Sequence, residues 1–431
     1  MKKIIALLLA CVMVLGMFAA CDSAETPDPT TGNDGATTGN DATTGNDGEV
    51  EVTDVTLKVW GPQEDQVDEN SWMIQMEKAF EEAHPEYNIT WDNGVCPEGD
   101  AATMVTADPA AAADVYMFAN DQLGTLLQAG ALAQLGGSYL EQVQNDVSAT
   151  YVNTVTSTDG KVYGFPVAPN TWFMYYNKAL VGDADITSME AILEKGIVAF
   201  EVKNSWYLPA FFFAAGGTLF GETGTDAAAG AQFGGEVGYN ATNAVLDLME
   251  NPNFKVDGDG YGNAGLKDGS VVAYFSGSWD YAGLYEALGD NLGAVAPPTV
   301  MINGEAKQLK SYAGSKAIGV NPNADNQKAA MQFAAFLASA DSQLLRFQLR
   351  NITPAVTALA ENADVAASIV ATAESATMAN ASVAQPTIAE MNPVWGPVGT
   401  FGTNIADGMV TRDTVTADVD AFYAQLNEGG L

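Results

Sequence analysis

The stretch from Val55 to Trp91 decides the fold class, because its pattern predicts a strand, a helix and a second strand in turn. "VTLKVW" alternates apolar and polar residues and is rich in β-branched side chains, as strands are. "SWMIQMEKAFEEAHPEY" places Trp72, Met76 and Phe80 on one helical face, and Pro85 ends the helix. "YNITW" returns to a strand pattern. Such alternation favours a parallel sheet with crossover helices, and therefore an α/β protein.

The remainder of the chain continues this pattern. "ADVYMFA", residues 113–119, predicts another strand, and "DQLGTLLQAGAL", residues 121–132, predicts the helix that follows it. "TWFMYYN", residues 171–177, predicts a strand, and the tail from Thr353 is mostly helical. The chain has 431 residues, of which 47% are hydrophobic, so it can build two or three domains with sizeable cores.

The charge balance excludes two classes of partner. The chain carries 17 Lys and Arg against 54 Asp and Glu, a net charge of −37. Nucleic acid needs a basic footprint for its phosphates, and an anionic membrane surface attracts basic residues. We therefore expect neither nucleic acid nor a membrane surface to be held by charge.

The N-terminus carries the signature of an exported lipoprotein. Lys2 and Lys3 precede the apolar run "IIALLLACVMVLGMFAA", which leads directly to Cys21, so residues 1–20 are predicted to be a signal peptide. The ending "MFAAC" resembles the bacterial lipobox, although Phe18 replaces the usual Leu. Cys21 is then the lipidation site, and its acyl chains would hold the protein on the outer face of the cytoplasmic membrane. The alternative is an ordinary secretory signal with an incidental Cys.

Residues 21–51 predict a flexible tether. The unit TTGND occurs three times, and the segment has almost nothing apolar to bury, so it cannot offset the entropy of ordering. Cys11 leaves with the signal peptide and Cys21 carries the lipid, which leaves Cys96 as the one free thiol. We therefore expect no internal disulfide, and stability must come from the core.

Several kinds of catalytic chemistry have no support in the sequence. His84 is the only histidine, and it stands at the end of a predicted helix, where a capping or solvated role is typical. A Ser-His-Asp device would have to use it, and zinc would find too few ligands. We expect no metal, no cofactor and no enzyme activity. Glycoside hydrolysis stays open, since it needs only two well-placed carboxylates.

Two motif-like strings are better explained as a Gly-rich surface loop. Residues 260–265, "GYGNAG", fit a dinucleotide fingerprint, but no apolar strand precedes them. Asp257, Asp259 and Asp268 imitate part of a calcium loop, but Tyr261 stands where an oxygen ligand is needed.

Five stretches resemble, in order, the extracellular solute-binding lipoproteins of ABC sugar importers, and most closely the maltose/maltodextrin-binding proteins. They are "DVYMFANDQLGTLLQAGALAQL", "VYGFPVAPNTWFMYYNKAL", "FSGSWDY", "AAMQFAAFLAS" and "QPTIAEMNPVW". The resemblance covers about nine-tenths of the chain. It implies a two-lobed periplasmic-binding-protein-like fold of type II, with discontinuous lobes joined by a hinge and ligand in the interlobe cleft.

The resemblance also implies where the lobes begin and end. The N-lobe would comprise residues 52–168 and 316–350, and the C-lobe residues 172–312 and 355–431. The chain would cross between them near residues 169–171, 313–315 and 351–354.

Twelve ligand contacts follow from the family motifs. They are Glu64, Asp65, Phe118, Asn120, Asp121, Gln122, Trp206, Tyr207, Trp279, Tyr281, Met391 and Trp395. The family commonly has a Lys near Asp65 and often an Arg at the position of Gln122, so this chain lacks both usual cations.

Aromatic rings suit such a site because a pyranose has apolar C–H faces and a polar belt of hydroxyl groups. Flat rings cover the faces, and carboxylates and amides bind the belt. "GSWDY", residues 277–281, is therefore predicted to be a sugar-stacking platform, with core packing as the alternative. Trp60, Trp72 and Trp91 fit strand or helix patterns and predict core, whereas Trp172 fits either role.

The function that these features favour is capture of a malto-oligosaccharide outside the membrane and delivery to an ABC permease by a monomer. Two alternatives stay open: a binding protein for a β-glucan or xylan oligomer, and a lipid-anchored glycoside hydrolase.

Overall fold

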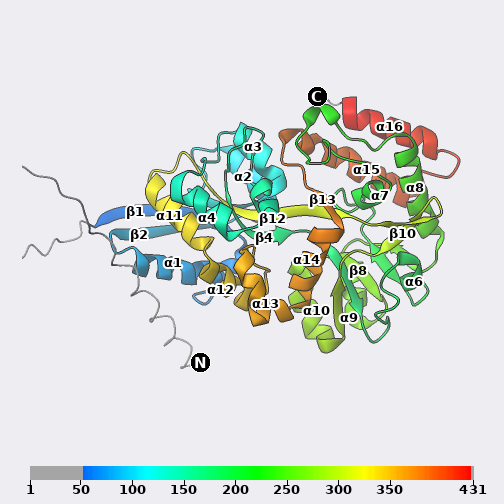
Figure 1. Ribbon diagram of the computed structural model, residues 1–431, viewed down its shortest axis with the longest axis horizontal. Coiled ribbons are helices and arrows are strands. Elements are labelled where there is room, and N and C mark those ends of the chain that lie inside the picture. The colour runs from blue at the N-terminus through cyan, green and yellow to red at the C-terminus, as the bar shows by residue number, and fades with distance from the viewer. Residues whose placement is uncertain (1–51, 429–431) are drawn as a thin grey trace, which may run out of the picture. The chain divides into compact units, whose positions relative to one another are not determined.

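The computed structural model describes residues 52–428 (Figure 1). The predicted signal peptide, the predicted lipidation site Cys21 and the predicted tether with its TTGND units lie outside these residues. Within the described chain, no helix is long and apolar enough to cross a membrane.

The first lobe is built on a sheet in the order β13-β12-β3-β1-β2, with β4 also paired to β12. β1, β2 and β3 are mutually parallel, and β12 runs antiparallel to β3 and β4. The strands are β1 (Thr53–Gly61), β2 (Tyr87–Val95), β3 (Val115–Ala119), β4 (Phe165–Asn170), β12 (Ser311–Val320) and β13 (Ser382–Ala384).

The strand–helix–strand pattern predicted for residues 55–91 is confirmed. Val55, Leu57 and Val59 alternate into the core from β1, and Trp72 and Phe80 enter it from α1. The helices that cover this sheet are α1 (Trp72–Ala83), α2 (Ala101–Ala107), α3 (Leu123–Gln128), α4 (Gly137–Asp146), α5 (Ala149–Thr154), α11 (Gln327–Leu337) and α12 (Ala340–Arg350).

The second lobe is built on a sheet in the order β7-β6-β8-β5-β9. β5 is apolar throughout because both of its faces are buried: Met174 packs in the core on one face of the sheet and Tyr175 in the core on the other. The strands are β5 (Phe173–Asn177), β6 (Val198–Phe200), β7 (Phe254–Val256), β8 (Ala273–Ser276) and β9 (Leu292–Val295), and β10 (Thr299–Ile302) and β11 (Glu305–Gln308) form a separate hairpin.

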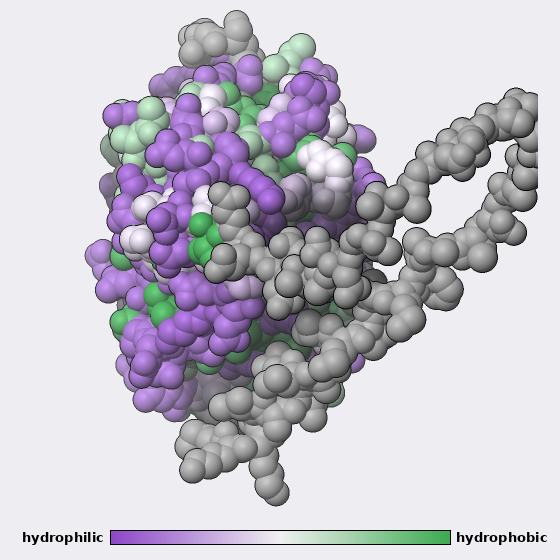
Figure 2. All heavy atoms as spheres, turned by 90° about the vertical axis from the view of Figure 1, so that its left-hand side faces the viewer, coloured by the Kyte–Doolittle hydropathy of each residue, from purple (hydrophilic) through white to green (hydrophobic). Residues whose placement is uncertain are grey.

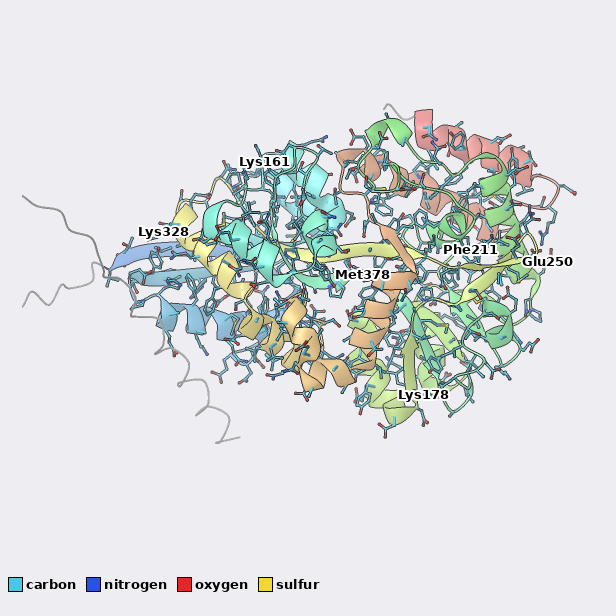
Figure 3. All side chains as sticks on the ribbon, in the orientation of Figure 1. Lys161, Lys178, Phe211, Glu250, Lys328 and Met378 are labelled. Carbon is cyan, nitrogen blue, oxygen red and sulfur yellow. The ribbon has the colours of Figure 1, made fainter. Side chains whose placement is uncertain are left out.

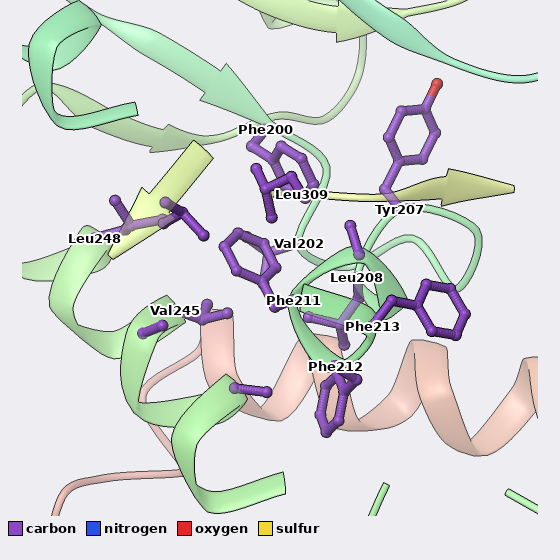
Figure 4. Close-up of a cluster of buried hydrophobic side chains, with 14 of the residues drawn as sticks. Phe200, Val202, Tyr207, Leu208, Phe211, Phe212, Phe213, Val245, Leu248 and Leu309 are labelled. Carbon is purple, nitrogen blue, oxygen red and sulfur yellow. The ribbon is translucent and has the colours of Figure 1, made fainter. Parts of the chain in front are cut away.

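One face of the second sheet is covered by a large aromatic core (Figure 4). α7 (Pro209–Ala214) is central to it, because its three consecutive phenylalanines are all buried. The remaining helices of this part of the chain are α6 (Met189–Leu193), α8 (Gly235–Glu250), α9 (Tyr261–Asp268), α10 (Tyr281–Leu288), α13 (Ala363–Ala367), α14 (Ile369–Asn380), α15 (Trp395–Ala406) and α16 (Val415–Glu428).

The chain passes between the two sheets at the first crossing that the sequence suggested, between β4 and β5. At the second, β12 is one continuous strand: its residues 311–313 pair with β13, and its residues 314–320 pair with β4 and β3 (Figure 1). After α12, residues 351–354 lead on to α13 and α14. Ala355, which we assigned to the second lobe, packs in the first core. The exact lobe boundaries stay a prediction.

The Gly-rich segment after β7 differs from the loop that we predicted. Residues 261–268 form α9, and Asp257 accepts the backbone N–H groups of Gly258 and Gly262 at 2.8 Å each. A Cβ at residue 262 would lie 2.3 Å from the Asp257 carboxylate, so glycine lets this carboxylate approach the helix start without a shift. Asp257 therefore serves the start of a helix.

Cys96 and His84 have structural positions. Burial raises the pKa of the Cys96 thiol to about 11, and the thiol has no exposed surface. His84 ends α1 and its Nδ1 lies 3.0 Å from Glu86. Figure 2, which views the molecule from the left-hand side of Figure 1, shows a largely hydrophilic surface with small, scattered apolar patches, as a net charge of −37 suggests.

Candidate ligand-binding cleft

A cavity of about 330 Å³ lies between the two lobes. The first lobe supplies mostly polar groups, and the second supplies indole rings. Its lining residues are Glu98, Gly99, Ala119, Asp121, Gln122, Asn170, Ser205, Trp206, Lys316, Gln385 and Trp395. A neighbouring cavity of about 440 Å³ shares Gly99, Asp121, Gln122 and Trp395 with it, so the two form an extended groove.

Three tryptophans form the wall that the second lobe contributes. Trp206 and Trp395 line the cavity, and the Trp279 ring lies 6.0 Å from that of Trp206, tilted by 37°. The Trp206 backbone N–H donates to the Asn204 side chain at 2.9 Å, which fixes the turn that presents the ring. Trp279 is 46% exposed, a large value for an indole at the end of a buried strand. An exposed flat ring at a cavity is what stacking against a pyranose requires.

Three polar residues follow β3, and their side chains have different roles. Asp121 faces the cavity, whereas the side chains of Asn120 and Gln122 form hydrogen bonds with the backbone. Asp121 lines the cavity, and burial raises its pKa to about 6. Asn120 is buried, and its Oδ1 accepts the backbone N–H of Ser315 at 2.9 Å, which ties β3 to the crossing strand. Gln122 lines the cavity, but its side chain bonds to the backbone of Gly99 and Ala102.

Five of the twelve predicted contacts are corrected, because the structure buries them away from the cavity: Asn120, described above, and four others. Asp65 and Phe118 have no exposed surface in the first lobe, and Met391 has none in the second. Tyr207 is 5% exposed and stacks on the Trp172 ring at 5.1 Å, within the aromatic cluster of Figure 4. Trp172 itself is fully buried, which decides its role in favour of core.

Two other predicted contacts are accessible but stand outside the cavity lining. Glu64 is exposed on the short helix after β1. Tyr281 begins α10 and stacks on Tyr285 at 5.4 Å. Both stay predictions as ligand contacts.

Sequence reasoning missed Gly99, Ala119 and five lining residues with polar side chains: Glu98, Asn170, Ser205, Lys316 and Gln385. One of them carried a visible signal. Lys316 is the only charged residue in "SYAGSKAIGV", a strand of small and apolar residues, and a lone charge on a buried strand indicates a specific partner. Asn170 lay within the predicted crossing at residues 169–171, whereas Gln385 and Ser205 had no comparable signal.

Lys316 places a cation in the lining of the cavity, whereas the family's usual Lys near Asp65 and Arg at the position of Gln122 are absent. Its Nζ lies 3.5 Å from Glu98 and 6.0 Å from the centroid of the Trp279 ring, so it reaches from the first lobe to the platform of the second. Glu98 also pairs with Arg346 at 3.3 Å. Although burial acts to raise it, the charges of Lys316 and Arg346 hold the pKa of Glu98 below its ordinary value. The cavity therefore contains a fixed ion pair of a carboxylate and an ammonium.

The lobes also touch where Gly124 of α3 meets residues 387–389. A Cβ at Gly124 would lie 2.3 Å from the backbone N of Ala389 and 2.8 Å from the backbone O of Thr387. Backbone atoms cannot move aside as a flexible side chain can. Only glycine therefore lets α3 and the start of η8 (Ala389–Val394) approach this closely.

Gly124→Ala is expected to hold the lobes apart and weaken ligand binding about 5- to 150-fold, since overpacking of about 1–3 kcal/mol would fall on this contact. Small-angle scattering with and without ligand, together with calorimetric titration, measures both effects. Gly136→Ala is the matched control, because a Cβ at Gly136 meets nothing within 4 Å. Unchanged affinity in Gly124→Ala would show that ligand binding does not depend on this approach.

Two α/β lobes joined by crossings of the chain, with an aromatic and polar cavity between them, define a two-lobed solute-binding protein. The chain belongs to the bacterial extracellular solute-binding protein family, whose model matches residues 75–373. The family and its relatives are binding proteins rather than enzymes, and the predicted two-lobed fold of type II is confirmed.

Three similar proteins match this chain over two thirds of its length or more. A maltooligosaccharide ABC transporter solute-binding lipoprotein of Streptococcus pneumoniae is 28% identical over 72% of this chain and 74% of its own. A galactooligosaccharide-binding protein of Bacillus subtilis is 27% identical over 68% of this chain and 72% of its own. A chain solved with acarbose is 45% identical, with a TM-score of 0.84 over 87% of this chain and 99% of its own.

Proposed function

We propose that the protein captures a linear α-linked gluco-oligosaccharide in this cleft and delivers it to an ABC permease. The observation that carries the proposal is the pairing of two unlike walls at one cavity. Trp206 and Trp395 line the second-lobe side, with Trp279 next to Trp206, while Asp121, Glu98 and Lys316 form the first-lobe side. A pyranose placed between them would offer C–H faces to the rings and hydroxyl groups to the charges.

Closure of the lobes would follow from the division of the site between them. A ligand that touches both walls gains contacts only when the lobes are together, so it shifts the population toward the closed state. At Gly124 the backbones of the two lobes already approach closely, as a closed state requires.

Calorimetric titration with an oligosaccharide panel tests the ligand class. The panel holds maltotriose, maltotetraose, acarbose, a galacto-oligosaccharide, a β-glucan oligomer and a xylo-oligomer, and each sample is then analysed for breakdown products. Selective binding of the α-linked series and acarbose without breakdown is the expected result. Selective binding of the galacto-oligosaccharide would show that the proposed ligand class is wrong. Breakdown products would show that the protein is a glycoside hydrolase and not a binding protein.

The proposal includes a lipid anchor on Cys21, the outer face of the membrane as location, and action as a monomer. The lipoprotein relative from Streptococcus pneumoniae and the lipobox-like ending support the anchor. A Cys21→Ala variant is expected to appear in the culture medium instead of the membrane fraction. Retention of that variant in the membrane fraction would show that Cys21 does not anchor the protein.

Acid is expected to weaken binding through Asp121. A carboxylate accepts hydrogen bonds from sugar hydroxyl groups, and its protonated form loses half of that capacity. Because the pKa is raised to about 6, the acceptor is intact above pH 7 and mostly protonated at pH 5, so affinity should fall about tenfold over that range. Asp121→Asn should bind weakly at pH 7.5 and show no such fall, whereas the exposed Glu141→Gln should keep it. An acid-induced fall that persists in Asp121→Asn would assign it to another group.

A further inference from the structure

The short turn that carries Trp279 is held by contacts that the binding mechanism has not used. β8 ends at Ser276, and η5 (Ser278–Asp280) follows after one glycine. β8 pairs with β5, the strand that ends just before Lys178, which is labelled in Figure 3. Trp279 is 46% exposed, so core packing alone does not fix the orientation of its ring. The turn beneath the ring must therefore do so.

Gly277 leaves the space in which the Trp279 ring lies. The six-membered half of the indole lies against this glycine: a Cβ there would stand 2.6 Å from ring atom Cε3 and closer still to Cζ3 and Cη2. The backbone of Gly277 is extended, with φ −112° and ψ −168°, a conformation open to any residue. The glycine is therefore needed for the ring and not for the turn. Because the ring is exposed, a side chain at residue 277 would displace the ring and leave the fold intact.

Asp280 ties the far end of the turn to β8. Its Oδ2 accepts hydrogen bonds from the hydroxyl groups of Tyr274 at 2.7 Å and Ser276 at 2.6 Å, and both donors are buried. Asn263 of α9 donates to the Tyr274 oxygen at 3.1 Å, so the proton of that hydroxyl group is directed to Asp280. Hydrogen bonds to an ionised carboxylate are stronger than those between neutral groups. The carboxylate therefore holds η5 firmly on the strand.

The near end of the turn is tied to β5. Tyr175 donates its hydroxyl group to the backbone O of Gly277 at 3.1 Å, and its ring stacks on that of Tyr274 at 6.0 Å. The neighbouring ring of the platform has an anchor of its own, the hydrogen bond between Trp206 and Asn204. The two indoles are thus presented by separate turns, and the tilt of 37° between them depends on both anchors.

We propose that Gly277 and Asp280 are positioning residues, which hold the Trp279 ring in one orientation before an oligosaccharide arrives. The proposal rests on the proposed function, because it names determinants of binding at the same site. A side chain that is ordered in advance loses little freedom when a ligand covers it, so the affinity is higher than with a mobile ring. Neither residue lines the cavity, and each acts on the ligand through the ring.

A double-mutant cycle, measured by calorimetric titration of the full chain with maltotriose, tests the role of Gly277. Gly277→Ala is expected to raise the dissociation constant about tenfold, since the ring must leave its place. In the Trp279→Ala background the same change should have an effect of about twofold or less, because no ring remains to be displaced. Gly258→Ala is the matched control, because a Cβ at Gly258 meets nothing within 4 Å. Equal effects of Gly277→Ala in the two backgrounds would overturn the proposal.

Conservative replacement tests the role of Asp280. Both hydroxyl groups bond the same carboxylate oxygen, so the amide oxygen of an asparagine can accept both, and Asp280→Asn should keep most of the affinity. Asp280→Ala removes the acceptor and should weaken maltotriose binding about three- to tenfold. The exposed Asp268→Ala is the control and should bind as the wild type does. Equal affinities of the two Asp280 variants would show that these hydrogen bonds do not position the ring.

A ligand-free measurement separates this inference from the proposed function. Two indoles 6.0 Å apart and held at a fixed tilt couple their electronic transitions, which gives paired bands of opposite sign in the circular dichroism spectrum. Trp206→Phe and Trp279→Phe should each abolish these bands and so assign them. Gly277→Ala and Asp280→Ala should weaken the bands strongly, whereas Gly258→Ala should keep them.

The two kinds of failure are then distinguishable. Bands that are absent from the wild type, or that persist unchanged in Gly277→Ala and Asp280→Ala, would overturn the proposal even if maltotriose binds. Absence of oligosaccharide binding by the wild type would instead refute the proposed function, and the circular dichroism spectra would still decide whether the two residues position the ring.

Discussion

Trp279→Ala is expected to raise the dissociation constant for maltotriose about thirty-fold or more while changing the melting temperature little. The ring is 46% exposed beside Trp206, so its removal sacrifices little core packing. In a complex the same ring would be covered by sugar and approached by the Lys316 ammonium, which lies 6.0 Å from it. Buried aromatic anchors of this kind contribute about 2 kcal/mol or more to binding.

Tyr285→Ala is the control for this change. Tyr285 is also 46% exposed and aromatic, but it is on α10 and does not line the cavity. Calorimetry and thermal melting of both variants give the comparison. Equal affinities for the Trp279→Ala variant and the wild type would show that Trp206 and Trp395 make the platform without Trp279.

Asp65→Asn is expected to lower the free energy of unfolding by about 3–5 kcal/mol, because it takes the paired carboxylate from the half-buried Arg350 and one of two paired carboxylates from the buried Arg346. Asp65 lies 2.6 Å from Arg346 and 2.8 Å from Arg350, and it has no exposed surface. Arg346 is 3% exposed and lies 4.8 Å from the Trp72 ring, so water cannot replace the lost carboxylate. Urea unfolding followed by tryptophan fluorescence measures the change.

Arg412→Met is the matched control for a broken ion pair. Arg412 pairs with Asp247 and Glu250, but all three side chains are well exposed. Exposed pairs contribute about 1 kcal/mol or less, so this variant should unfold close to the wild type. A loss in Asp65→Asn no larger than that in Arg412→Met would mean that Glu98 and solvent compensate for the missing carboxylate.

The local elements were predictable because their signals are local. The alternation in β1, the apolar face of α1 and the stop at Pro85 are all contained within neighbouring residues. The position of β12 in the sheet could not be predicted from neighbouring residues, because Lys316 pairs with Ala119 and Ala168, which are far from it in sequence. Strand order depends on such distant pairings, and periodicity carries no information about them.

The candidate site shows the same division. Trp206, Trp279 and Trp395 could be predicted as site residues, because a large aromatic ring directly after a turn is seldom needed for core packing. Asp65 matched a ligand position, but the structure pairs it with Arg346, 281 residues away. Its carboxylate is part of the fold for a reason that only tertiary packing reveals. Lys316 shows the opposite case: the sequence did not predict it as a site residue, and the strand that carries it places it in the cleft.

The course of β12 has a consequence for how the protein is made. Its partners β3 and β4 end by residue 170, yet the strand that joins them is completed only at Val320. The core of the second lobe waits longer still, since Val419 and Phe422 belong to it. A growing chain therefore cannot finish either lobe until most of it has left the ribosome. Such late closure would suit the export signal predicted for residues 1–20, because an exported chain passes through a narrow channel in an extended form before it folds on the other side.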